Sequence, residues 1–336
     1  MNGPLFLGVE IGGTKLQVGL GAADGGDPVI VRAEVEAGAR ATRVLDQVRG
    51  CWEVLLKKCA RSATDVAAVG VGFGGPVDMA TGSVLKSHQV GGWEGLPLTD
   101  WFRHATGCPH VVVRNDADTA ALAEARFGAG RGISPLLYVT VGTGIGGGLV
   151  VDGKIYQGTG KAATELGHLW VPTEAGLQHL EDVSSGKGIA DHAKLTGTGS
   201  STVATTKEIG EAARRGDPSA LALLKRARDA LAFGLAQAIT LLAPRRIILG
   251  GGVSLIGEDL WIGPIRAELT RWEFESLKGT YDLVASSLGE EVVVHGALAL
   301  ARDLHEGGEG ASDRAPASIG GTNLASSGNS PFQPHG

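Results

Sequence analysis

The chain has 336 residues, of which 43% are hydrophobic and 20% charged, and its formal net charge is −6. A negative charge without a run of Lys and Arg argues against nucleic acid or an anionic membrane as a partner, and no apolar run approaches the ~18 residues of a membrane span. Three cysteines without metal-ligand spacing indicate free thiols, and no signal peptide is evident, so we expect a cytoplasmic protein.

The first part of the chain predicts strands that end in glycine, interrupted by helices. Residues 4–20 have the pattern of a strand, a glycine loop and a second strand. Residues 41–60 place apolar side chains at helical spacing, and residues 66–75 indicate a buried strand ending in glycines. Residues 111–130 predict a strand followed by a helix that glycine closes, with Asn115-Asp116 at the junction.

The segment VTVGTGIGGGLVVDGK, residues 139–154, contains the G-x-G-x-x-G spacing of dinucleotide-binding proteins. That spacing is meaningful only where a helix follows it. Here an apolar run leads instead to Asp152-Gly153, which predicts a hairpin between two strands. A nicotinamide oxidoreductase is therefore excluded. The same strand, glycine loop and strand occur in residues 4–20, about 130 residues earlier, so we expect two related lobes facing a shared cleft.

The second part predicts further helices and one more strand that ends in glycine. Thr205 with Glu208 fits a capping box, and a long helix is expected after Asp217-Pro218. Residues 245–254 predict a strand running into glycines, and residues 296–304 a final helix. From about residue 306 the composition cannot bury a core, so the tail is expected to be disordered.

Three strand-to-glycine junctions indicate a nucleotide site. They are Gly12-Gly13-Thr14-Lys15, Gly142 to Gly148, and Gly250-Gly251-Gly252. Glycine after a strand lets backbone N–H groups converge on phosphate oxygens. One such loop is more often a plain turn, but three favour a nucleotide cleft. The chain contains no G-x-x-x-x-G-K-[ST] motif, so it is not a P-loop enzyme.

Six motifs in order carry a resemblance to a known family: EIGGTK, GFGGPVD, NDADTAALAE, VGTGIGGGLVVDGKIYQG, ELGH and ILGGGVS. Together they resemble the ROK family of sugar kinases and sugar-responsive repressors, over residues 5 to about 303. The resemblance implies an α/β fold of the actin/hexokinase/Hsp70 type, with two RNase H-like lobes around a nucleotide and sugar cleft. The implied lobes are residues 1–115 with the C-terminal helix 295–305, and residues 116–294; residues 306–336 form the tail.

The resemblance implies ATP-dependent phosphorylation of a hexose, with glucose the expected acceptor. Asp116 matches the family's catalytic Asp, which takes the proton of the sugar hydroxyl. A local interpretation makes Asp116 the N-cap of the following helix. A helix N-terminus would keep its carboxylate ionised, so the two roles are compatible.

The remaining implied contacts belong to the sugar and to ATP. The implied sugar-binding residues are Gly75, Asn115, Asp116, Glu165, His168 and Glu181. The implied ATP-binding residues are Gly12, Gly13, Thr14, Lys15, Gly142, Thr143, Gly144, Gly250 and Gly251. Non-sugar roles stay open for three of these residues: turn bonding for Asn115, a hydrogen-bonded structural role for His168 and a solvated charge for Glu181.

The sequence departs from the family's pattern at three places. Glu10 stands where the family has an Asp that helps to hold Mg²⁺ through water. The family's structural zinc segment is replaced by a shorter one without Cys, and His168 with His179 cannot complete a tetrahedral site, so we predict no zinc. Thr164 replaces a Gly that precedes the sugar-contacting Glu165, which is expected to reshape the sugar pocket.

Two other functions were weighed against the kinase. A DNA-binding repressor is disfavoured because the chain begins on the first glycine-loop strand and is negatively charged. A non-catalytic sugar or nucleotide sensor of the same fold stays open because of Glu10 and the altered zinc segment, although a pure binder has no need of Asp116. The phosphoryl donor and the exact sugar are not fixed by the sequence, and a homodimer is implied only by the family.

Overall fold

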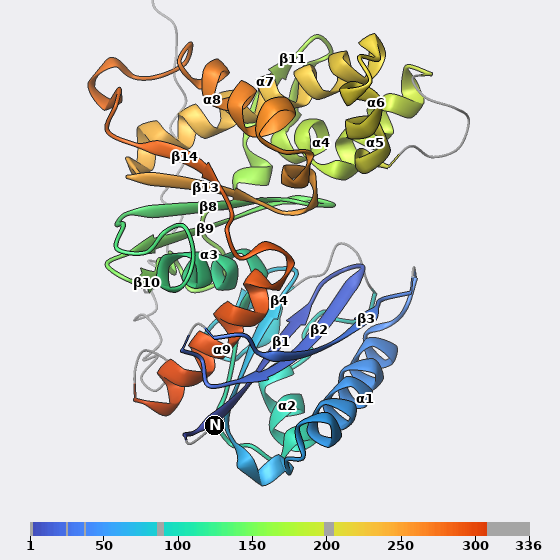
Figure 1. Cartoon of the computed structure of the whole chain (residues 1–336), viewed down its shortest axis with the longest axis vertical. Coiled ribbons are helices and arrows are strands. Elements are labelled where there is room, and N and C mark those ends of the chain that lie inside the picture. The colour runs from blue at the N-terminus through green and yellow to red at the C-terminus, as the bar shows by residue number, and fades with distance from the viewer. Residues whose placement is uncertain (1–2, 25, 37, 86–90, 198–204, 308–336) are drawn as a thin grey trace, which may run out of the picture.

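The computed structural model describes residues 3–24, 26–36, 38–85, 91–197 and 205–307, and has two sheet-containing lobes arranged one above the other (Figure 1). Residues 308–336 of the predicted tail lie outside the described residues.

The strands are β1 (Leu5–Ile11), β2 (Lys15–Gly21), β3 (Val29–Glu34), β4 (Val66–Phe73), β5 (Val77–Asp78), β6 (Ser83–Val84), β7 (Val111–Asn115), β8 (Leu136–Val141), β9 (Ile145–Val151), β10 (Lys154–Ile155), β11 (Trp170–Thr173), β12 (Gly176–His179), β13 (Arg246–Gly250) and β14 (Asp282–Ala285). The α-helices are α1 (Ala41–Cys59), α2 (Leu98–Thr106), α3 (Asp116–Arg126), α4 (Leu180–Ser184), α5 (Gly186–Leu195), α6 (Thr206–Arg214), α7 (Pro218–Leu242), α8 (Gly263–Leu269) and α9 (Val292–His305).

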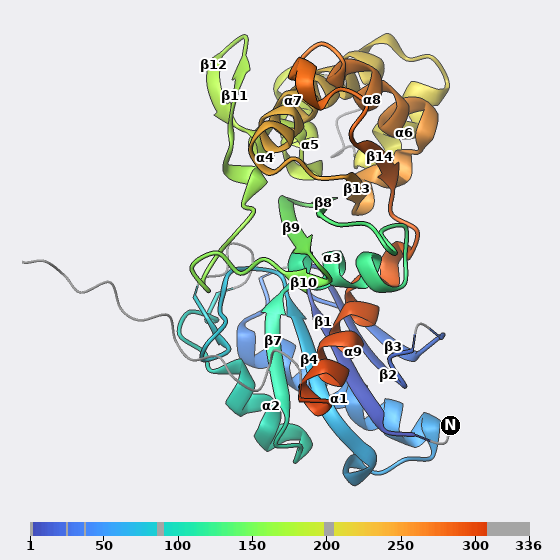
Figure 2. The ribbon, with the colours of Figure 1, turned by 90° about the vertical axis from the view of Figure 1, so that its left-hand side faces the viewer.

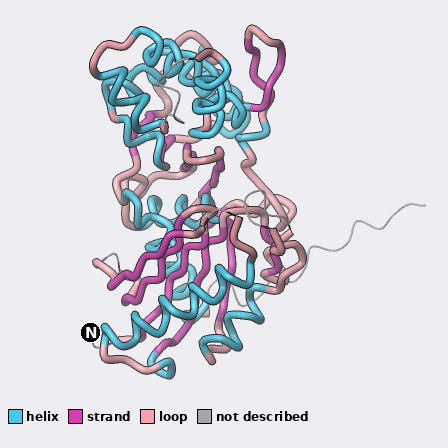
Figure 3. Tube along the Cα trace, turned by 90° about the vertical axis from the view of Figure 1, so that its right-hand side faces the viewer, coloured by secondary structure: helices cyan, strands magenta, loops and turns pink. Residues whose placement is uncertain are grey.

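The first lobe is built on a five-stranded sheet in the order β3-β2-β1-β4-β7. β1 and β2 form the predicted antiparallel hairpin, and β4 and β7 follow in parallel. Helices α1 and α2 cover one face, where Val44, Trp52 and Phe102 join the apolar side chains of β1 and β4. Figure 3 shows these helices flanking the strands of the sheet.

Helix α9 covers the other face of the first sheet, although it comes from the far end of the chain (Figure 1). Glycines in the strands let it lie directly on the backbone. A Cβ at Gly70 would lie 1.9 Å from the carbonyl oxygen of Ala297, and one at Gly8 would lie 2.8 Å from that of Val294. An alanine at either position would therefore push the helix away from the sheet.

The second lobe repeats the plan of the first. Its sheet has the order β10-β9-β8-β13-β14, again an antiparallel hairpin, β8–β9, followed by two parallel strands. The hairpin encloses the second glycine loop, just as β1–β2 encloses the first. The internal repeat predicted from residues 4–20 and 139–154 is thus present in the strand order. The core of the second lobe packs around the long helix α7, in which Leu224, Leu231 and Leu235 are fully buried.

One segment returns the chain from the second sheet to the first lobe. We call residues 286–291, between β14 and α9, the crossover. Glu124 near the end of α3 is fully buried and accepts hydrogen bonds from Ser286 Oγ at 2.6 Å and from the backbone N–H groups of Ser287 and Leu288 at 3.0 and 3.2 Å. Helix α3 packs on both α9 and β9, so it also lies between the lobes. No helix among the described residues is long and apolar enough to cross a membrane.

Candidate functional site

The first glycine loop, the end of β4 and the start of α3 meet at one edge of the first sheet. The loop closes through a hydrogen bond of 2.9 Å from Gly12 N–H to the Lys15 carbonyl oxygen. Gly74, just after β4, donates from its N–H to the carbonyl oxygen of Ile11 at 2.8 Å. Because β7 runs parallel to β4, its last residue, Asn115, emerges beside the same loop.

Asn115 is the N-cap of α3, and Asp116 is the first residue of the helix. Asn115 Oδ1 accepts from the N–H groups of Ala117 and Asp118 at 2.8 and 3.3 Å, and its Nδ2 donates to the Gly75 carbonyl oxygen at 3.1 Å. The local capping role weighed for Asp116 thus belongs to Asn115. Asp116 Oδ1 accepts from the N–H of Ala117 at 2.8 Å.

The surroundings of Asp116 favour its protonated form. Burial, followed by the negative charge of Glu10, raises the pKa of Asp116 from 3.8 to about 7, although part of its surface stays open. Glu165 adds a smaller contribution in the same direction. The backbone N–H groups at the helix N-terminus do lower the pKa of Asp116, as predicted, but desolvation and the like charge of Glu10 act more strongly in the opposite direction.

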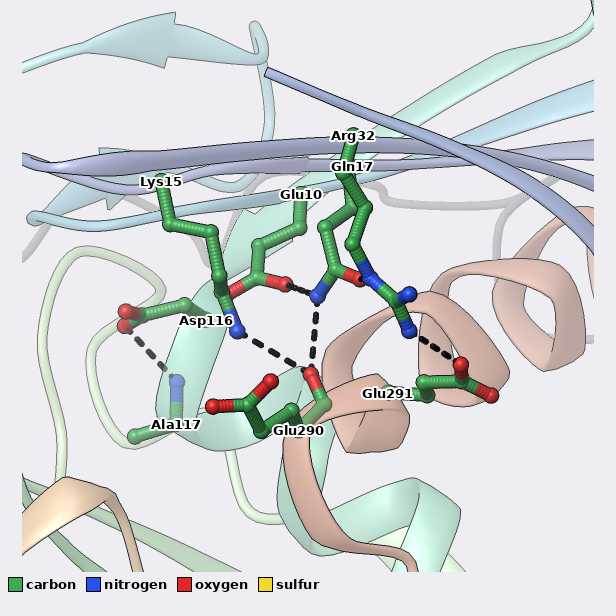
Figure 4. A network of polar contacts seen from close by, with 8 residues as sticks. All are labelled: Glu10, Lys15, Gln17, Arg32, Asp116, Ala117, Glu290 and Glu291. Atoms are coloured by element: carbon green, nitrogen blue, oxygen red, sulfur yellow. Dashed lines mark hydrogen bonds and ion pairs between the residues drawn. The ribbon is translucent and has the colours of Figure 1, made fainter. Parts of the chain in front are cut away.

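Glu10 lies at the end of β1 and is almost fully buried. Its Oε1 pairs with Lys15 Nζ at 3.2 Å, and its Oε2 accepts from Gln17 Nε2 at 2.6 Å (Figure 4). Burial raises the pKa of Glu10 above its ordinary value, while Lys15 and Gln17 act against that rise. Glu10, whose side chain is longer than that of the Asp implied by the resemblance, is therefore held at both carboxylate oxygens.

Lys15 and Gln17 also bind the crossover from the other lobe. Lys15 Nζ and Gln17 Nε2 both donate to the backbone carbonyl oxygen of Glu290, at 3.0 and 2.8 Å. Figure 4 shows the side chains of Glu10, Lys15 and Gln17 extending from the hairpin toward Glu290, with Asp116 beside them. The predicted first phosphate loop is thus tied to the segment that links the lobes.

The second glycine loop contacts the start of α4 and of α5. Its turn closes through a bond of 2.9 Å from Gly142 N–H to the Gly144 carbonyl oxygen, and Gly186 N–H donates to the Gly142 carbonyl oxygen at 2.8 Å. Glu181 Oε2 accepts from the N–H of Ile145 at 2.8 Å. Glu181 was expected to be either a sugar-binding residue or a solvated charge. A solvated charge does not account for this contact with the backbone.

At the third junction, glycine is required by close backbone approach. Gly251 has φ +83°, and a Cβ there would lie 2.5 Å from the carbonyl oxygen of Val141 at the second loop. A Cβ at Gly250 would meet the buried hydroxyl of Tyr138 at 2.1 Å. The second and third glycine junctions therefore lie side by side, as strands β8 and β13 pair in parallel.

Glu165 lies close enough to the base candidate for its charge to act on it, since it raises the pKa of both Asp116 and Asp118. The preceding Thr164 has φ +57°, the left-handed region that a β-branched residue rarely adopts. This is the position at which the family resemblance implies a glycine. The backbone turn is thus kept although the residue has changed.

A β-hairpin replaces the zinc segment that the resemblance implies. Strands β11 and β12 form it, and they project from the second lobe (Figure 2). The rings of Trp170 and His179 stack with centroids 4.1 Å apart, and His168 meets His179 edge-on at 5.5 Å. Within the described part of the chain, no group of three or more His, Cys, Asp or Glu side chains is placed to hold a metal ion. The absence of zinc stays a prediction.

Sequence reasoning missed Gln17, Arg32 and the carbonyl of Glu290. Gln17 is fully buried within a strand that, after its first residue Lys15, is otherwise apolar or Gly. A single amide in such a strand was a usable signal, because a buried polar group needs partners. Besides Glu10 on the neighbouring strand, its partners lie on β3 and at the crossover, and no local pattern points to these two.

The chain is similar to proteins of one family along nearly its whole length. A model of the ROK family matches residues 6–304. The glucokinase of Thermotoga maritima is 34% identical over 317 residues, which are 89% of this chain and 97% of that protein.

Two solved structures have the same architecture. A ROK family glucokinase from Streptomyces griseus, in complex with glucose and AMPPNP, has a TM-score of 0.77 and 32% identity, covering 89% of this chain and 99% of its own. A ROK hexokinase from Thermus thermophilus has a TM-score of 0.75 and 29% identity, covering 90% and 100%. The predicted α/β fold with two sheet-containing lobes is thereby confirmed.

Proposed function

The chain belongs to the ROK family, and from this premise we propose that it acts as a glucokinase-like sugar kinase, which transfers the γ-phosphoryl group of ATP to a hydroxyl of glucose. The proposed proton transfer depends on the position and the pKa of Asp116. This residue stands at the N-terminus of α3 beside the first glycine loop, with a pKa of about 7. A base whose pKa lies near the working pH is best suited to take a proton during the reaction.

In the proposed reaction, the glucose hydroxyl oxygen attacks the γ-phosphorus of ATP and gives its proton to Asp116. The bond from the γ-phosphorus to the bridging oxygen breaks, and ADP leaves with that oxygen. Such transfers depend mainly on positioning and on neutralising charge. The proposed ATP contacts are the backbone of Gly12, Gly13 and Thr14, the Lys15 ammonium, and the backbone of Gly142, Thr143, Gly144, Gly250 and Gly251.

The carboxylates near the first loop fit a magnesium site. Mg²⁺ prefers carboxylate oxygens and keeps several of its waters, and Glu10 is placed to bind such waters beside Lys15. A cation at this place would also offset the repulsion by which Glu10 raises the pKa of Asp116. When bound, Mg²⁺ neutralises charge on the phosphoryl group being transferred. Glu10 and Asp116 are the residues of this chain that would face it.

We propose that the sugar is held by Asn115, Glu165, His168 and Glu181, with Gly75 lining the site. Asn115 Nδ2 already bonds Gly75 with one hydrogen, so its second amide hydrogen is the one proposed for the sugar. Glu165 precedes a short 3₁₀ turn, Leu166–His168, which places His168 one turn further on.

The lobe boundaries stay a proposal: residues 1–115 with helix 295–305, and residues 116–294. A homodimer and a cytoplasmic location also remain predictions from the family resemblance and composition.

The proposed function is tested by ADP release with ATP and Mg²⁺ against a panel of sugars. The panel is glucose, fructose, mannose, N-acetylglucosamine and N-acetylmannosamine. We expect the highest kcat/KM with glucose. Saturable sugar or nucleotide binding without turnover of any sugar would instead identify the chain as a sensor.

A further inference from the structure

Three polar side chains stand in a row across the first sheet, at the same register on neighbouring strands. Glu10 on β1 is directly opposite Gln17 on β2, and Gln17 is directly opposite Arg32 on β3. Elsewhere on this face α9 packs on glycines such as Gly8 and Gly19. The three polar side chains therefore lie at the end of this face where α9 begins, beyond its apolar contact with the sheet.

Both amide hydrogens of Gln17 and its amide oxygen form hydrogen bonds, and these fix the orientation of the amide. Its Nε2 donates one hydrogen to Glu10 Oε2 at 2.6 Å and the other to the Glu290 carbonyl oxygen at 2.8 Å. Its Oε1 accepts from Arg32 Nε at 2.8 Å. Arg32 has donors only, so a flipped amide would face a donor with its NH₂ and a carboxylate with its oxygen. The NH₂ group must therefore point at Glu10.

The far end of the row is attached to the crossover as well. Arg32 forms an ion pair with Glu291, next to the residue that Gln17 binds (Figure 4). The crossover is also held at its start, at Ser286 and Ser287, by the buried carboxylate of Glu124. A shift between the second lobe and α9 would thus act on Gln17 directly.

The Glu10 side chain needs this support because of its length. It carries one more methylene than the Asp that the family resemblance implies, and so one more rotatable bond to fix. Lys15 anchors one carboxylate oxygen and Gln17 the other. Lys15 is itself a proposed phosphate contact, so Gln17 is the anchor that ATP does not engage.

Resting on the proposed function, we propose that Gln17 is a positioning residue: it fixes the Glu10 carboxylate for Mg²⁺ and couples it to the crossover between the lobes. Groups that orient a metal-binding carboxylate typically change metal affinity by about 10- to 100-fold when removed. A residue needed only for folding would instead alter stability and leave the metal dependence unchanged.

The experiment compares Gln17→Met, which keeps the length and removes the amide, with wild type and with Gln237→Met. Gln237 lies in α7, and its amide donates to the Phe233 carbonyl oxygen at 3.4 Å. We expect Gln17→Met to raise the Mg²⁺ concentration for half-maximal turnover by about tenfold. The KM for glucose should change by less than about twofold, and Gln237→Met should change neither quantity.

A double-mutant cycle separates positioning from a general effect on the site. In the Glu10→Gln background, adding Gln17→Met should shift the Mg²⁺ dependence by less than about twofold, because the group that it positions has lost its charge. The same tenfold shift in both backgrounds, or no shift in wild type, overturns the proposal. If Gln17→Met does not fold, Arg32→Met takes its place, since the Arg32 side chain is 52% exposed; a shift in the same direction supports the proposal, and none overturns it.

A readout without turnover keeps this inference distinct from the proposed function. The rise in Tm caused by ADP is measured with Mg²⁺ and with EDTA. We expect the Mg²⁺-dependent part of that rise to be reduced in Gln17→Met and unchanged in Gln237→Met. If wild type phosphorylates no sugar, the proposed function fails, while this measurement still decides on Gln17.

Discussion

The carboxylate of Glu181 accepts a hydrogen bond of 2.8 Å from the backbone N–H of Ile145, the first residue of β9. Helix α4 is thereby fastened to the second glycine loop. A Cβ at Gly144 would lie 2.3 Å from the same carboxylate oxygen, so loop and carboxylate fit closely. A residue proposed for the sugar therefore also shapes the loop proposed for ATP.

Replacing Glu181 should separate these two roles. Glu181→Gln keeps an acceptor oxygen for Ile145, whereas Glu181→Ala leaves that N–H unpaired, at a cost of about 1–3 kcal/mol if it stays buried. We expect Glu181→Ala to raise the KM for both ATP and glucose by about tenfold, and Glu181→Gln to raise only that for glucose. Steady-state kinetics with each substrate varied in turn measures both values. An unchanged ATP KM in Glu181→Ala would remove the loop role.

The pKa of Asp116 predicts the pH dependence of the rate. The base must be deprotonated, so kcat/KM for glucose should fall by about tenfold per pH unit below about pH 7. In Glu10→Gln one of the like charges is lost, and the midpoint should move to lower pH. The profile is measured at saturating ATP and Mg²⁺, where the bound cation would offset part of the Glu10 repulsion, so the wild-type midpoint should lie somewhat below the pKa of about 7. A midpoint that stays in place in Glu10→Gln would contradict the coupling between the two carboxylates.

The buried carboxyl group of Asp118 should make the protein less stable as the pH rises. Asp118 is 3% exposed, and its Oδ1 has no hydrogen-bond partner among the described residues. Its pKa is raised from 3.8 to about 8 by burial and by the charges of Glu165 and Asp116. Between these pH values the folded state keeps a proton that the unfolded state has released, so rising pH disfavours folding. Each pH unit in this window costs about 1.4 kcal/mol.

Asp118→Asn should remove this loss. Between pH 5 and pH 7 we expect the free energy of unfolding of wild type to fall by about 3 kcal/mol more than that of Asp118→Asn. Urea unfolding at both pH values gives the difference, and wild type is the reference at each pH. Parallel pH profiles for the two proteins would show that Asp118 does not titrate in this range.

The left-handed backbone of Thr164 should be measurable as strain. Asn tolerates φ near +57° far better than a β-branched residue, so Thr164→Asn should raise the free energy of unfolding by about 1 kcal/mol. The matched control is Thr270→Asn, because Thr270 has an ordinary φ of −57°. Equal effects at the two positions would argue against strain at Thr164.

Much of the fold follows from short local patterns. The two hairpins around glycine loops were predictable because pairs of apolar strands interrupted by Gly runs specify them locally, and Asp152-Gly153 specified the further turn between β9 and β10. Likewise, the start of α3 at Asp116 followed from the residues around it. The family resemblance then supplied the roles of these motifs, which spacing alone does not give.

What the sequence did not predict depends on contacts far apart in the chain. Gln17 meets Glu290 across 273 residues, and Glu124 meets Ser286 across 162. The raised pKa of Asp116 depends on how completely the fold surrounds it, which the N-terminal position in a helix does not reveal. Similarly, Thr164 gives no sign in the sequence that its φ is positive.

The central claim is that Asp116 is the general base of a sugar kinase, and Asp116→Asn tests it most directly. ADP release with glucose is measured for wild type, Asp116→Asn and the matched control Asp118→Asn, with glucose binding followed by calorimetry. We expect Asp116→Asn to bind glucose within about threefold of wild type but to lose at least about 100-fold in kcat, while Asp118→Asn keeps its kcat within about threefold. A kcat for Asp116→Asn close to that of wild type would contradict the assignment.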